Sequence, residues 1–189
     1  MASEGPGPGR RSFGRLVVTA AQELRAHGYH ADADATLDRV LVGHLGGMLD
    51  EDDMLWLGQG AYLAGRWAEA WAIFDSLHRL HPEELDYVGW LGVTHARLGE
   101  GAAALGIDSA LAEFPTSHIQ SGRPSRWRAR IAAALGDRER AVAWLQLART
   151  EGMRLGFGSS RGGLHQYHGL AAAVAHVLKR SPLCWFAAK

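Results

Sequence analysis

Residues 55–82 read "LWLGQGAYLAGRWAEAWAIFDSLHRLHP", and their pattern of apolar residues and glycines predicts how the chain folds. Its apolar residues recur every three or four positions, which is typical of amphipathic helices. Gly58 and Gly65 interrupt the pattern, although a glycine inside a helix costs roughly 1 kcal/mol relative to alanine. Two glycines in one stretch therefore indicate a structural role for them, and the same spacing elsewhere in the chain indicates which role.

A spacing of tryptophan, eight residues, glycine, four residues and alanine occurs three times along the chain. The copies are Trp56, Gly65 and Ala70, then Trp90, Gly99 and Ala104, then Trp127, Gly136 and Ala141. The first two copies start 34 residues apart and the last two start 37 apart. A fainter copy upstream keeps Gly28 and Ala33 and has Thr19 in place of the tryptophan. This periodicity predicts a repeat protein.

Each copy is expected to form a helical hairpin. About twelve residues ending near the repeated glycine form a first helix, helix A, and the glycine supplies a left-handed turn that a side chain would penalise. A second helix, helix B, of about fourteen residues then ends near Pro82 or Pro115. Small residues seven positions before each turn let the two helices approach closely, and they are Ala21, Gly58, Gly92 and Ala129. One hairpin cannot bury its apolar face alone, so successive hairpins are expected to stack. No alternating β-branched runs occur, which predicts an all-α fold without sheet.

The period and its small, turn-glycine, alanine and proline positions resemble the tetratricopeptide repeat family. The match is best over residues 51–84, where the family pattern falls on Leu57, Gly58, Gly65, Trp67, Ala70, Phe74, Leu77, Leu80 and Pro82. The resemblance implies a right-handed superhelical stack of antiparallel helix–turn–helix repeats. Its approximate repeats are 14–47, 51–84, 85–118 and 122–153, with a capping helix at 168–180, a disordered leader at 1–13 and a tail at 181–189.

The chain departs from the family pattern at three places. Gly101 stands where an aromatic residue is usual, and Asp108 stands where a large apolar residue is usual. The tryptophans of the A helices stand two positions after the usual place of the family's large aromatic residue. Two positions correspond to about 200° around a helix, so these side chains are expected to point away from the contact within their own hairpin.

Two alternatives follow for the tryptophans. They either line a concave groove formed by successive A helices, or they wedge against the neighbouring A helix as core. Tryptophan, tyrosine and arginine are enriched in binding hot spots, which favours a peptide or helix of a partner bound in the groove. The predicted partner-binding residues are Trp56, Gln59, Tyr62, Trp90, Arg97, Arg126, Trp127 and Arg130.

A cluster of arginines lies near the start of the last hairpin, at Arg123, Arg126, Arg128, Arg130, Arg138 and Arg140. Guanidinium groups bind carboxylates and phosphates, so one interpretation is a site for an acidic peptide or a phosphate. The other is a solvated helix face whose charge is balanced by Asp137 and Glu139.

The patterns that suggest catalysis or cofactors lack their structural context. "GSSRG" at 158–162 fits a nucleophile elbow around Ser160, but no Asp or Glu follows it and no buried strand precedes it. "GEGAAA" at 99–104 mimics a dinucleotide-binding loop without the required strand. The histidine pairs three residues apart, such as His78 and His81, come without a Cys/His quartet. We therefore expect no catalytic residues, no cofactor and no metal.

The balance of charged residues indicates which classes of partner the chain is not expected to bind. Lys+Arg and Asp+Glu number 20 each, and the isoelectric point is near 7.2, which argues against a bulk electrostatic grip on nucleic acid or anionic membrane. The single cysteine, Cys184, fits a reducing compartment and predicts a cytoplasmic protein. The function expected is a non-catalytic protein–protein interaction module. The alternatives are a regulatory or sensory segment of a bacterial kinase or transcription-regulator system and, less favoured, a serine hydrolase using Ser160. The sequence leaves the partner and the oligomeric state open.

Overall fold

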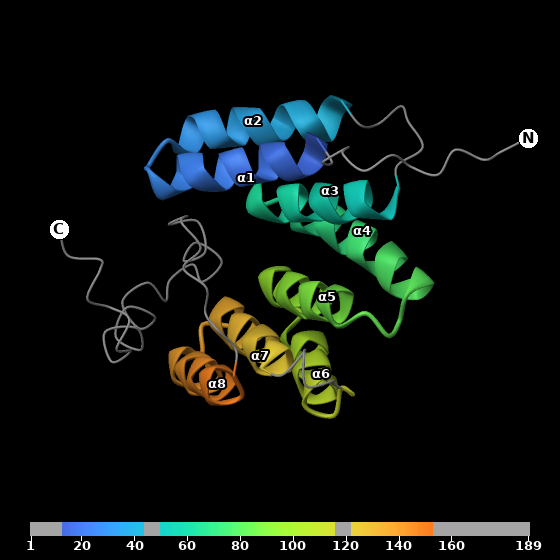
Figure 1. Ribbon diagram of the computed structural model, residues 1–189, viewed down its shortest axis with the longest axis vertical. Helices are drawn as coiled ribbons and strands as arrows, with labels where there is room; N and C mark the ends of the chain where they lie inside the picture. The colour runs from blue at the N-terminus through green and yellow to red at the C-terminus, as the bar shows by residue number, and fades with distance from the viewer. Residues whose placement is uncertain (1–12, 44–49, 116–121, 153–189) are drawn as a thin grey trace, which may run out of the picture. The chain divides into compact units, whose positions relative to one another are not determined.

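The computed structural model describes residues 13–43, 50–115 and 122–152, and these ranges form eight helices and no strand (Figure 1). The all-α expectation is therefore confirmed for the described part of the chain. The chain divides into two compact units, Met1–Ile73 and Phe74–Lys189, and each is described by itself. The predicted capping helix at 168–180, the tail at 181–189 and nearly all of the predicted leader lie outside the described residues.

The first unit contains α1 (Phe13–Ala26), α2 (His30–Gly43), α3 (Glu51–Leu63) and the start of α4 (Trp67–Leu80). Helices α1 and α2 pack as a hairpin, and α3 packs against both. The core of this unit consists of Val18, Ala21, Ala33, Leu37 and Leu63, and Trp56 packs against its edge.

The second unit contains the end of α4 and the hairpins formed by α5 (Leu85–Arg97) with α6 (Gly101–Ala112) and by α7 (Arg123–Ala134) with α8 (Arg138–Thr150). Helix α7 packs on α5, α6 and α8, so the two hairpins of this unit share one core. Within the last hairpin, Ala129, Ala132, Ala141 and Leu145 are buried together.

The A helices of the sequence prediction are α1, α3, α5 and α7, and each ends just before a repeated glycine as predicted. Gly28, Gly65, Gly99 and Gly136 have φ between 77° and 84°, a region that costs glycine nothing. After Gly99, the Glu100 amide donates to the His95 carbonyl at 3.0 Å, and the amide of Gly99 itself donates to Ala96 at 3.3 Å. The same pair of bonds recurs at the other three turns. This is the Schellman arrangement, which satisfies carbonyls that a helix end leaves open.

The small residues of the A helices permit the close contacts expected of them. A Cβ placed on Gly92 of α5 would lie 2.4 Å from Ile131 Cδ1 of α7 and 2.8 Å from Ile107 Cγ2 of α6. Gly92 therefore contacts both its own hairpin partner and the next A helix. Its equivalents Ala21 and Ala129 are fully buried, and Gly58 is buried as well.

Candidate binding site

Trp127 of α7 fills the space between α7 and α5. Its indole lies directly on the backbone of Gly89, where an added Cβ would stand only 2.1 Å from Cδ2 of the ring. Its Nε1 donates a hydrogen bond of 2.8 Å to Asp86 Oδ1, also on α5. The side chain is 1% exposed. Gly89 thus leaves room for the ring, and Asp86 accepts a hydrogen bond from its only polar atom. We call these two residues of α5 the seat of Trp127.

An aromatic column continues from this seat. The ring of Trp90 stacks on Phe74 with centroids 5.1 Å apart and meets Trp127 edge to face at 5.2 Å. The guanidinium of Arg130 lies 4.2 Å from the Trp90 ring and 4.1 Å from the Trp127 ring. Arg130 is 3% exposed, so a cation is enclosed between two indole faces, where cation–π attraction is strongest because water is excluded.

Above the column lies a charged rim that is open to solvent, made by Asp86, Arg123 and Arg126. Arg123 Nη2 is 2.7 Å from Asp86 Oδ2, whereas Arg126 Nη2 is 3.7 Å from Asp86 Oδ1, which is longer than a hydrogen bond. The Arg126 guanidinium also lies 5.4 Å from the centre of the Trp127 ring. The three side chains are between 27% and 32% exposed, so a molecule in solution can reach them.

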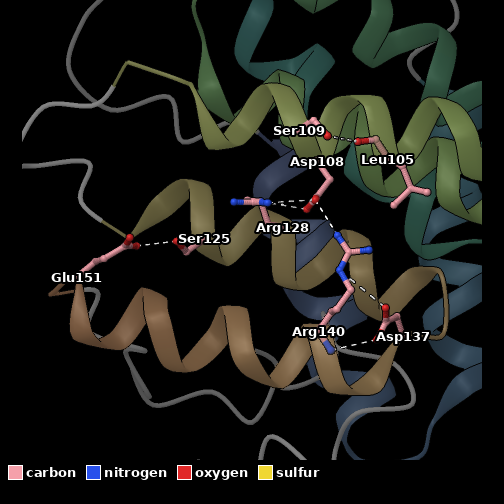
Figure 2. Close-up of polar contacts among 8 residues, drawn as sticks. All are labelled: Leu105, Asp108, Ser109, Ser125, Arg128, Asp137, Arg140 and Glu151. Atoms are coloured by element: carbon pink, nitrogen blue, oxygen red, sulfur yellow. Dashed lines mark hydrogen bonds and ion pairs between the residues drawn. The ribbon is translucent and has the colours of Figure 1, made fainter.

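A second charged centre holds α6, α7 and α8 together around Asp108 (Figure 2). Arg128 binds its carboxylate in two places, at 3.2 Å and 3.3 Å, and Arg140 adds a third contact of 2.9 Å. The Arg128 guanidinium also lies 3.6 Å from the centre of the Trp144 ring. Asp108 is buried, and its burial is tolerated because two cations surround it. Asp108 is therefore an internal ion-pair partner of Arg128 and Arg140.

The arginine cluster is thus divided by its environment. Arg128 and Arg140 pair with Asp108, Arg123 pairs with Asp86, and Arg130 lies inside the aromatic column. Of the two acids expected to balance the charge, Asp137 lies 3.8 Å from Arg140, and Glu139 is exposed. The main counter-charges are instead Asp86 on α5 and Asp108 on α6, which lie outside the stretch of sequence that holds the arginines.

The predicted binding residues are distributed over both units. Trp90, Arg126, Trp127 and Arg130 lie together on α5 and α7, and Arg97 is half-buried at the end of α5. Trp56, Gln59 and Tyr62 lie on α3 in the first unit, where Tyr62 is buried and the other two are half-buried.

Of the two alternatives for the tryptophans, the core alternative describes Trp90 and Trp127. Trp56 is half-buried; its Nε1 donates 3.2 Å to Asp52 Oδ1, and Arg15 lies 5.8 Å from the centre of its ring. The binding role of the whole set stays a prediction. On α5 and α7 the charged side chains beside the buried rings that are partly exposed are those of Asp86, Arg123 and Arg126.

Asp86 and Gly89 hold Trp127 in place, but neither was predicted from the sequence to belong to the site. A signal for Asp86 exists, since Asp52 precedes it by one 34-residue period and each stands four residues before a repeated tryptophan. Both aspartates accept a hydrogen bond from a tryptophan Nε1. Gly89 carried no such signal, because its role depends on a side chain 38 positions later.

The patterns set aside in the sequence have ordinary structural roles wherever they are described. Gly99 and Gly101 flank the α5–α6 turn and follow no strand. Within the described ranges no group of three or more His, Cys, Asp or Glu is placed to hold a metal ion. Ser160 and the histidines near it lie outside the described residues.

Comparison with known proteins adds no relative: no family model matches the chain, and no curated protein matches it. None of the helices in the described residues is long and apolar enough to cross a membrane.

Proposed function

We propose that the chain is a non-catalytic protein-interaction module whose hairpins are repeats of the tetratricopeptide type and whose A helices bind a peptide or helix of a partner. A cytoplasmic location, which the single cysteine favours, belongs to the same proposal. The A-helix surface of the second unit, made by α5 and α7, supplies the contact residues. Trp56, Gln59 and Tyr62 are the candidates on α3.

The observation that carries the proposal is that α5 and α7 combine buried aromatic rings with the partly exposed charged side chains of the rim. The buried rings of Trp90 and Trp127 are fixed by a hydrogen bond, by Gly89 and by Arg130. Asp86, Arg123 and Arg126 lie beside these rings and are partly exposed; an ion pair joins Asp86 to Arg123, and the Arg126 guanidinium contacts the Trp127 ring. Side chains that already have such contacts lose less conformational freedom when a partner arrives, which favours binding.

A peptide-display selection against the immobilised full-length chain tests the proposal. We expect enriched peptides to bind with micromolar affinity in solution. Hydrogen exchange measured by mass spectrometry should then show protection of 85–97 and 123–134 when an enriched peptide is added. A selection that enriches no sequence, or protection confined to other helices, contradicts the proposal.

A further inference from the structure

Arg126 uses less of its hydrogen-bonding capacity than the neighbouring arginines at the start of α7. A guanidinium carries five N–H donors. The Nη2 of Arg126 is 3.7 Å from Asp86, and its Nε is buried and finds no acceptor within the described part of the chain. Its position over the Trp127 ring, 5.4 Å from the ring centre, holds the group in place without using a donor. The partly exposed Arg126 guanidinium therefore has an Nη2 that lies beyond hydrogen-bond distance of Asp86 and that an acceptor from solution can approach.

Asp86 is the carboxylate nearest to Arg126, and other donors already occupy it. Its Oδ1 accepts the Trp127 Nε1 hydrogen bond at 2.8 Å, and its Oδ2 lies 2.7 Å from Arg123. The carboxylate is thus directed towards Trp127 and Arg123 and leaves Arg126 at a longer distance. A second carboxylate placed over the rim would reach Arg126 with the bidentate geometry that Asp86 does not provide.

We propose that Arg126, assisted by Arg123, binds a carboxylate of an acidic partner peptide, and that Asp86 is an internal competitor that limits the affinity. This inference rests on the proposed function and names the partner's chemistry. Asp86 lowers the positive potential of the rim and holds Arg123 in an intramolecular pair. An incoming acidic side chain must share or replace these contacts, so the affinity depends on Asp86 as well as on the arginines.

The experiment measures fluorescence anisotropy of fluorescein-labelled octa-glutamate with the full-length protein at low ionic strength, and uses octa-lysine as the opposite-charge probe. Asp86→Asn can keep Oδ1 as the acceptor for Trp127, while it removes the negative charge and places an amide donor where Oδ2 faces Arg123. We expect it to bind octa-glutamate three- to tenfold more tightly than the unmodified chain. Arg126→Ala is expected to weaken binding about tenfold, and octa-lysine is expected not to bind.

Arg138→Ala is the matched control, because it removes an exposed arginine from α8 and leaves the rim intact. Equal losses for Arg126→Ala and Arg138→Ala would mean that the peptide responds to net charge alone, and would overturn the inference. Unchanged affinity in Asp86→Asn, with circular dichroism showing an intact fold, would overturn the role of Asp86. Display selection of peptides without acidic residues, protecting α5 and α7, would contradict the acidic partner while leaving the proposed function standing.

Discussion

The two tryptophans Trp56 and Trp127 occupy the same place in their repeats and end in different environments. Trp127 is buried and donates its Nε1 hydrogen to Asp86 on the preceding A helix. Trp56 is half-buried and donates to Asp52, four residues earlier in its own helix. Since the repeat position is shared, the difference must come from the helix that each ring faces.

The facing helices differ at the position just before the repeated tryptophan site. In α5 this position is Gly89, and the Trp127 ring occupies the space that a side chain would take. In α1 the equivalent position is Val18, which is fully buried in the core against which Trp56 packs. A branched side chain at Val18 fills the space that Gly89 leaves open, so Trp56 has no seat of the same depth.

The polar partners differ in the same way. Four residues before the repeated tryptophan site, α5 carries Asp86 and α1 carries Arg15. An arginine cannot accept a hydrogen bond, so the Nε1 of Trp56 takes a carboxylate from its own helix, and Arg15 lies near the ring face instead. The burial of a repeated residue is therefore decided by two positions on its neighbour.

Replacing the two rings by alanine gives the largest contrast. Trp127→Ala is expected to lower the free energy of unfolding by about 4 kcal/mol, because it empties a buried space and leaves Asp86 and Arg130 without the ring that they contact. Trp56→Ala is expected to cost about 1 kcal/mol, since its ring is only partly buried. Urea denaturation followed by circular dichroism at 222 nm measures both. Equal losses would show that the seat on Gly89 adds nothing to stability.

Filling the seat is expected to have the next largest effect. The Cβ of Gly89→Ala would stand 2.1 Å from Cδ2 of Trp127, so the ring must move, and we expect a loss of about 2–3 kcal/mol. Gly106→Ala on α6 is the matched control, because nothing lies within 4 Å of its Cβ position. The control should gain about 0.5–1 kcal/mol from helix propensity. If thermal melting moves in the same direction for both variants, the ring does not need the space at Gly89.

The features that local chemistry determines could be predicted from sequence. Within the described ranges, the four turn glycines and the eight helices follow from the φ that a turn requires and from apolar spacing, and both appear where expected. The depth of Trp127 could not be predicted, because it depends on Gly89 in another hairpin. The pairing of Asp108 with Arg128 and Arg140 was missed for the same reason, since its partners stand 20 and 32 residues away. Periodic sequence defines the hairpin, whereas contacts between hairpins depend on positions that differ from copy to copy.

Replacing the aspartates that accept the hydrogen bonds of the two indoles is expected to give the smallest of these differences in stability. Asp86→Ala leaves the buried Nε1 of Trp127 without an acceptor and removes the nearer of the two carboxylates beside Arg123, the other being Glu84 at 3.7 Å, so we expect a loss of about 2 kcal/mol. Asp52→Ala removes an acceptor from a half-buried indole that water can still reach, and the expected loss is about 0.5 kcal/mol.

Asp86→Asn separates the two contributions at Asp86, because the amide keeps an acceptor for Nε1 and removes the charge. We expect it to recover more than half of the stability lost in Asp86→Ala, as measured by urea denaturation. If Asp86→Asn lowers the free energy of unfolding as much as Asp86→Ala does, the ion pair with Arg123, and not the hydrogen bond from the indole, is the contribution of Asp86 to stability. The seat for Trp127 would then consist of Gly89 alone, and Arg15 in α1 would no longer explain why Trp56 turns to its own helix.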